Sequence, residues 1–97
     1  NVLTLRVIAP PDTTRGDVRA FWRLAKDPFQ EVDVENLQPI FEAEGKKNPK
    51  LVVLVKIDRM AKYRYMVDII DQLQFAELNR FSLAPLEPAE KQEVETL

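Results

Sequence analysis

The sequence predicts an α+β fold in which two helices pack on one face of a small mixed β-sheet. Residues 3–8 alternate between apolar and other side chains, as a half-buried strand does. Residues 51–57 are almost continuously β-branched or aliphatic, which is typical of a strand in the interior of a sheet. Two further segments repeat apolar residues at helical spacing, and a sheet beside them would bury both stripes.

The strand predicted at residues 3–8 places Leu3, Leu5 and Val7 on one face, and the prolines at 10–11 end it. Because proline removes a donor from the hydrogen-bond ladder, the strand cannot continue past them in a regular sheet. This segment opens the chain and is therefore one candidate for an edge of the sheet.

Residues 13–32 fit two templates equally well. They match one face of a helix if the apolar set is Val18, Phe21, Trp22 and Ala25. They match an alternating strand if the set is Val18, Ala20, Trp22 and Leu24. Trp22 belongs either to the core or to a binding surface, since tryptophan is favoured in both.

Asp33 is the expected N-cap of a first helix over residues 34–44, with Pro39 near its first turn. Its apolar stripe consists of Leu37, Ile40 and Phe41. Gly45 is the expected residue just past its end, where glycine readily takes a left-handed backbone conformation.

A second helix is predicted over residues 62–78. Its apolar stripe consists of Tyr63, Met66, Val67, Ile70 and Leu73, widened by Ile69 and Ala76. A last short strand follows at 81–86. The strand at 51–57, this helix and the last strand form a β-α-β unit over 51–86, so the two strands should be parallel and the crossover right-handed.

A single domain over residues 1–86 accounts for these elements, and residues 87–97 form an acidic tail that we expect to be flexible or weakly helical. The chain begins at Asn1 with no signal-peptide pattern. No apolar run reaches the roughly 20 residues that cross a bilayer. We therefore expect this chain to be a piece of a longer protein.

The composition argues against several classes of function. The net charge is −2 with no basic cluster, which disfavours nucleic-acid binding. Cysteine and histidine are absent, so disulfides, thiolate metal sites and the commonest general base are excluded. Two glycines cannot build a phosphate-binding loop.

The remaining chemical candidates are weak. Ser82 has no base at an identifiable spacing. Asp68 and Asp71 are neighbours on one helix face, and a solvated surface explains them better than a magnesium site, which usually needs more oxygen ligands. We therefore predict no enzymatic activity, no catalytic residue, no cofactor and no metal site.

Residues 48–86 follow a recognisable order: an Asn48-Pro49 loop, the strand at 51–57, Asp58-Arg59, Tyr63, and then the helix and the closing strand. The helix matches at Met66, Val67, Ile69, Ile70, Asp71 and Leu73, and the closing segment at Ala76, Leu78, Arg80, Phe81, Ser82, Leu83 and Ala84. This order resembles the C-terminal half of the ExbD/TolR family of biopolymer transport proteins. The positions that we take as family-motif residues are Asp58, Tyr63, Asp71, Leu73, Ser82 and Leu83.

Two positions depart from the family pattern. Lys62 stands where proline is frequent, and Glu77 stands where glycine would supply a left-handed helix end. Asn79 tolerates that conformation and is the expected substitute. Because the family often has extended chain before its first helix, the resemblance favours a hairpin over residues 18–32.

The resemblance implies the periplasmic domain of a single-pass inner-membrane protein, anchored through an N-terminal helix that this sequence does not show. Family members dimerise inside a channel that is formed by ExbB/TolQ-like subunits. Proton flow there drives motion that is passed to a TonB-like or TolA-like protein. The essential membrane aspartate of the family lies in that helix, so this segment would act as a homodimer through protein contact alone.

Recognition by this segment would use strand edges, since an exposed edge can pair with a strand of another chain. The candidate edge residues are Leu3, Leu5 and Val7 in the first strand and Phe81, Ser82, Leu83 and Ala84 in the last. Two other classes compete: an unrelated α+β interaction module of a cell-envelope complex, and a small hydrolase that uses carboxylates. A pocket with converging acidic groups would favour the hydrolase.

Overall fold

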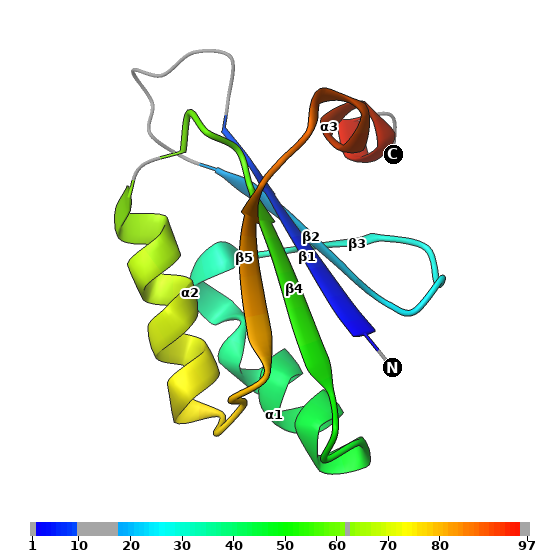
Figure 1. The fold of residues 1–97 in the computed structure, drawn as a ribbon, viewed down its shortest axis with the longest axis vertical. Helices are drawn as coiled ribbons and strands as arrows, with labels where there is room; N and C mark the ends of the chain where they lie inside the picture. Colours follow the sequence, from blue (N-terminus) through cyan, green and yellow to red (C-terminus); the bar gives the residue numbers. More distant parts are fainter. Residues whose placement is uncertain (1, 10–17, 62, 96–97) are drawn as a thin grey trace.

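The computed structural model describes residues 2–9, 18–61 and 63–95, without the side chains of 91 and 93–95. Five strands form one mixed sheet with α1 and α2 on one face, and α3 lies on the other side of the sheet (Figure 1). The elements are β1 (Val2–Ile8), β2 (Arg19–Leu24), β3 (Gln30–Val32), the 3-10 turn η1 (Val34–Asn36), α1 (Gln38–Lys47), β4 (Val52–Ile57), α2 (Tyr63–Phe75), β5 (Phe81–Pro85) and α3 (Pro88–Glu95). The predicted α+β class and the two helices on one face of a mixed sheet are confirmed.

The strand order is β3-β2-β1-β4-β5, which makes β1 the central strand. It pairs antiparallel with β2 and parallel with β4. The suggestion that Leu3, Leu5 and Val7 form an edge is therefore wrong. β2 folds back along one side of β1 and β4 occupies the other, and all three side chains are fully buried in the core between the sheet and the helices.

The β-α-β unit predicted over 51–86 is present, since β4 and β5 are parallel with Val55 opposite Leu83. The ambiguous segment forms a β2–β3 hairpin, as the resemblance favoured, while residues 13–17 lie outside the described residues. Arg19 and Glu31 bridge the hairpin at 3.0 Å, and this hydrogen bond lowers the pKa of the Glu31 carboxyl.

The main core lies between the sheet and the two helices. Its members are Leu3, Leu5, Val7, Ala20, Val34, Leu37, Phe41, Leu51, Val53, Val55, Tyr65, Ile69, Leu73 and Leu78, with Trp22 packed against it. A smaller apolar cluster on the opposite face holds Ile8, Phe21 and Leu86, with Phe29 beside it. Because α3 and this cluster cover the second face at one end, β1 is more deeply buried there than a half-buried strand would be.

The first helix begins later and ends later than predicted. Asp33 caps η1 by accepting a hydrogen bond from the backbone N–H of Glu35, and α1 then runs from Gln38 through Gly45 to Lys47. The prediction that Gly45 ends the helix is wrong. A Cβ at this position would lie 2.9 Å from a methyl carbon of Leu78, so the glycine allows α1 to pack closely.

The end of α2 is closed by Glu77, which takes the left-handed conformation with φ of 60°. The N–H of Leu78 donates to the carbonyl of Leu73 at 3.0 Å, as in a Schellman motif. Asn79 is therefore not the substitute for the family's glycine. Glutamate occupies the glycine position itself and bears the steric cost of this conformation.

The acidic C-terminal segment forms α3, in line with the helical alternative for this region. The division into a domain over 1–86 and a tail over 87–97 stays a prediction.

Replacing Glu77 by glycine should stabilise the protein. The substitution removes a left-handed cost of roughly 1–2 kcal/mol, partly offset by the larger backbone entropy of glycine in the unfolded chain. We expect a net gain of about 0.5–1 kcal/mol in the free energy of unfolding, measured by urea denaturation. The control is Asn79→Gly, which should bring no such gain. If the stability of Glu77→Gly is unchanged or lower than that of the parent, this account of the helix end is wrong.

Candidate functional site at the β5 edge and the uncovered face of α2

The helix α2 is rotated relative to the orientation that its apolar stripe predicts. Tyr65, Ile69 and Leu73 are its buried residues. Tyr63 is 72% exposed and Val67 38% exposed, although both were expected in the core. The prediction was right for Leu73 and wrong for these two, so part of the apolar surface of α2 faces outward.

The side chain of Gln72 explains this rotation. Its Oε1 accepts hydrogen bonds from the N–H groups of Leu37 at 2.7 Å and Gln38 at 2.9 Å. Its Nε2 donates to the carbonyl of Val34 at 2.9 Å. The N-cap residue of α1 is Leu37, which has no side chain able to cap, so a glutamine from the other helix satisfies these backbone groups.

Rotating α2 to bury Tyr63 and Val67 would carry Gln72 away from three partly buried backbone groups. Unsatisfied groups of this kind cost roughly 1–3 kcal/mol each, as much as the burial of one more apolar side chain gains. The sequence pattern did not indicate this arrangement, because Asp33 was the expected N-cap of the first helix, and in the structure it caps η1 instead.

We expect Gln72→Leu to lower the free energy of unfolding by roughly 2 kcal/mol, because the freed N–H groups of α1 lose their acceptor. Gln74→Leu is the matched control, since Gln74 is exposed on the same helix and should change stability by less than about 0.5 kcal/mol. Urea denaturation followed by circular dichroism measures both. Equal stability of the two variants would show that Gln72 does not hold α2 in place.

The strand β5 is the terminal strand beside α2, with β4 on one side and the end of the described sheet on the other. The carbonyl of Arg80 and the N–H of Leu86 bond to β4. Because backbone groups alternate in direction along a strand, those of Ser82 and Ala84 also point to β4, and the N–H and carbonyl of Leu83 point outward. This outward pair is available to an incoming strand.

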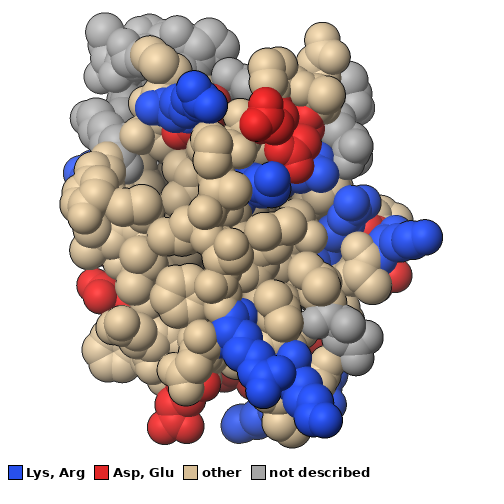
Figure 2. Space-filling model, viewed as in Figure 1, with Lys and Arg blue, Asp and Glu red and all other residues tan. Residues whose placement is uncertain are grey.

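A groove of about 390 Å³ lies between this edge and the start of α2. Its apolar lining comes from Ile57, Ala61, Tyr63, Met66, Leu83, Ala84 and Pro85. Figure 2 shows that the face over β4 and β5 is largely without charged side chains, which gather at its margins. An apolar groove beside an outward-pointing strand edge suits an extended segment that adds to the sheet.

The family-motif positions fall into two groups. Asp58, Tyr63 and Leu83 line the groove, and Ser82 lies beside Leu83 in β5. Leu73 belongs to the core, and Asp71 is exposed on α2 away from the groove lining.

Asp58 shapes the mouth of the groove. It is buried, with Oδ2 accepting from the N–H of Ala9 at 3.1 Å and Oδ1 from the N–H of Met60 at 3.0 Å. The carboxylate thereby ties the end of β1 to the turn after β4. Its contacts indicate a structural role at this site.

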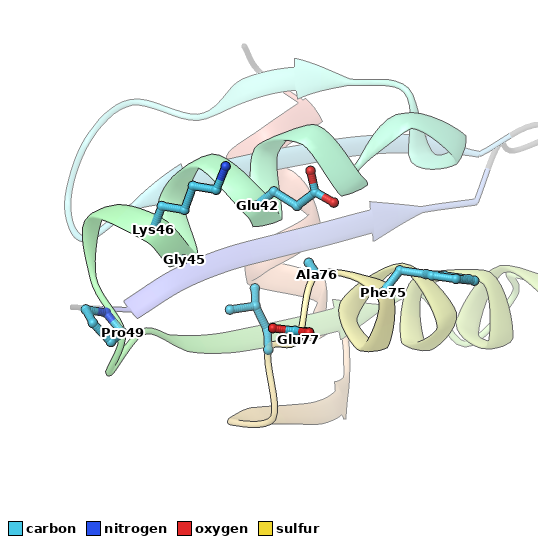
Figure 3. Close-up of a pocket in the computed structure, with 8 residues that line it drawn as sticks. Glu42, Gly45, Lys46, Pro49, Phe75, Ala76 and Glu77 are labelled. Carbon is cyan, nitrogen blue, oxygen red and sulfur yellow. The ribbon is translucent and has the colours of Figure 1, made fainter.

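A second pocket of about 520 Å³ lies between the ends of α1 and α2. Figure 3 shows Glu42 and Lys46 on α1, with Phe75 and Glu77 across the pocket at the end of α2. The carboxylates of Glu42 and Glu77 thus line this pocket from opposite sides. Among the described residues, no group of three or more acidic side chains is placed to hold a metal ion.

A family model described as biopolymer transport protein ExbD/TolR matches residues 4–86. This chain belongs to the ExbD/TolR family. The match extends the resemblance seen at residues 48–86 to the first half of the chain, and it favours a family member over an unrelated interaction module. A search of curated proteins found no match.

Membership of the ExbD/TolR family places the chain in the energy-transduction machinery of biopolymer transport. The family is transport-associated and not enzymatic, and its members are membrane-anchored proteins with a periplasmic domain. In the part of this chain that the structure describes, no helix has both the length and the apolar character that crossing a bilayer requires.

Proposed function

We propose that this chain is the periplasmic domain of an inner-membrane complex driven by the proton motive force, of the ExbB-ExbD-TonB or TolQ-TolR-TolA type. It acts as a homodimer and passes force through protein contact to an outer-membrane transport or envelope system. Family membership supports the setting. The observation that supports the mode of contact is the outward backbone of Leu83 beside an apolar groove.

In this proposal a strand from a second copy, or from a TonB-like or TolA-like partner, pairs with β5 as a sixth strand. Its inward side chains enter the groove and cover Tyr63 and Met66 of α2, which are largely and partly exposed in the free chain. Main-chain hydrogen bonds supply affinity, and the groove selects apolar side chains.

A partner paired along β5 is also suited to carrying force. A pull along the strand loads several ladder hydrogen bonds together, and β5 passes that load to β4 and β1 in the centre of the sheet. The proton step needs an ionisable group within the membrane and belongs to the membrane helix of the complex and its ExbB/TolQ-like channel subunit.

Leu83→Pro tests this mode of pairing, because proline removes the outward N–H and leaves the bonds to β4 in place. We expect Leu83→Pro to weaken association by roughly tenfold or more, corresponding to about 1.4 kcal/mol. Leu83→Ala, which keeps the N–H, should weaken it less. Sedimentation equilibrium across concentration measures the homodimer, and calorimetry with a TonB-like or TolA-like periplasmic segment measures the partner.

Unchanged association of a folded Leu83→Pro variant, both with itself and with the partner segment, would exclude pairing at β5. If Leu83→Pro loses only self-association, the edge belongs to the dimer contact. If it loses only partner binding, the edge belongs to the partner contact.

A further inference from the structure

The face of the sheet opposite α1 and α2 carries a second set of contacts, which the proposed function does not use. Leu86 packs there with Ile8 and Phe21 in the smaller apolar cluster. Four residues later, Glu90 lies between two cations: its carboxylate is 3.8 Å from Arg6 and 3.6 Å from Lys56. The guanidinium of Arg6 also donates to the backbone carbonyl of Glu90 at 3.1 Å.

The sheet supplies the basic side of this contact. Arg6 is buried in the central strand, and Lys56 is mostly buried in β4. Arg6 and Arg23 both lie over the ring of Phe29, at 4.5 Å and 4.4 Å from its centroid. The ring of Phe29 thus holds the two arginines on this face, next to the apolar cluster.

The helix that covers this face, α3, has little intrinsic stability. At 8 residues α3 is shorter than the roughly 12–15 residues that an isolated helix needs in water. Its first turn depends on Glu90 again, whose carboxylate accepts from the N–H of Glu87 at 3.1 Å as in a capping box. The family match covers residues 4–86 and does not include α3.

We propose that this basic and apolar face is a docking site for an acidic segment of a partner protein, and that α3 occupies the site in cis. The segment recognised has an apolar residue four positions before a glutamate, as Leu86 and Glu90 are spaced. The apolar residue enters the cluster of Ile8 and Phe21, and the glutamate bridges Arg6 and Lys56. A partner that carries this pattern displaces α3 and binds on the side of the sheet opposite the helices.

The test uses the full chain and a synthetic peptide of residues 86–97 as the probe. Glu90→Lys places a cation beside Arg6 and Lys56 and should release α3. Glu90→Gln removes the negative charge without adding a positive one, so its effect should be smaller. Glu87→Lys is the matched control, since it makes the same charge change at an exposed position of the same segment. Amide hydrogen exchange in α3 reports release, and NMR titration with the peptide reports docking.

We expect faster exchange of α3 in Glu90→Lys and, to a smaller degree, in Glu90→Gln. In these variants the peptide should shift the amide signals of Arg6 and Lys56 at concentrations roughly tenfold lower than in the parent or in Glu87→Lys, because α3 no longer competes. High salt should weaken this binding. A peptide with its own Glu90→Gln change should bind more weakly.

Two results would overturn the proposal. If α3 exchanges as slowly in Glu90→Lys as in the parent, the contact is not held by charge. If α3 is released and the peptide still causes no shift at Arg6 and Lys56, the uncovered face is not a docking site.

Discussion

Three hydrogen bonds from the side chain of Gln72 join α2 to the backbone that leads into α1. They fix the rotation of α2 on the sheet, because no other side chain of the described residues caps the start of α1. With that rotation, Ile69 and Leu73 complete the core, and the outer apolar stripe of α2 is left beside β5. The groove at the sheet edge is thus a consequence of how two helices satisfy each other's polar groups.

The sheet itself makes two different kinds of surface available. At the β5 edge the backbone is the recognition element, and the apolar groove beside it adds selectivity for side chains. On the second face the recognition elements are fixed cations beside an apolar cluster, and α3 already covers them. The two surfaces are reached through different elements, so binding at one does not require the other to be vacant.

Sequence reasoning found the elements that depend on local pattern. The strands at 2–8 and 52–57 and the helix over 63–75 follow from apolar periodicity and β-branched runs. The position of β1 in the sheet could not be read in the same way, because strand order depends on long-range pairing and the first strand of a chain can be central or peripheral. The side of α2 that is buried was partly misjudged, since Tyr63 is as apolar as Tyr65, which lies in the core in its place.

The edge residues of the candidate site were partly predictable. Leu83 was singled out because it lies in a short terminal strand, and the structure places that strand at the sheet edge. The groove beside it was not predictable, as it arises from the polar contact made by Gln72. The role of Glu90 was hidden for a related reason: a glutamate in an acidic segment gives no sign of the arginine and lysine that it meets in strands far away in sequence.

Amide hydrogen exchange at three consecutive residues of β5 tests the central claim most directly. In the dilute chain, the amides of Ser82 and Ala84 should be protected through β4 while that of Leu83 exchanges quickly, and in the dimer or the partner complex Leu83 should become protected as well. This result would establish that another strand pairs with the outer edge of β5. If Leu83 exchanges equally fast in the free and the associated protein, association occurs elsewhere and the account of the β5 edge is wrong.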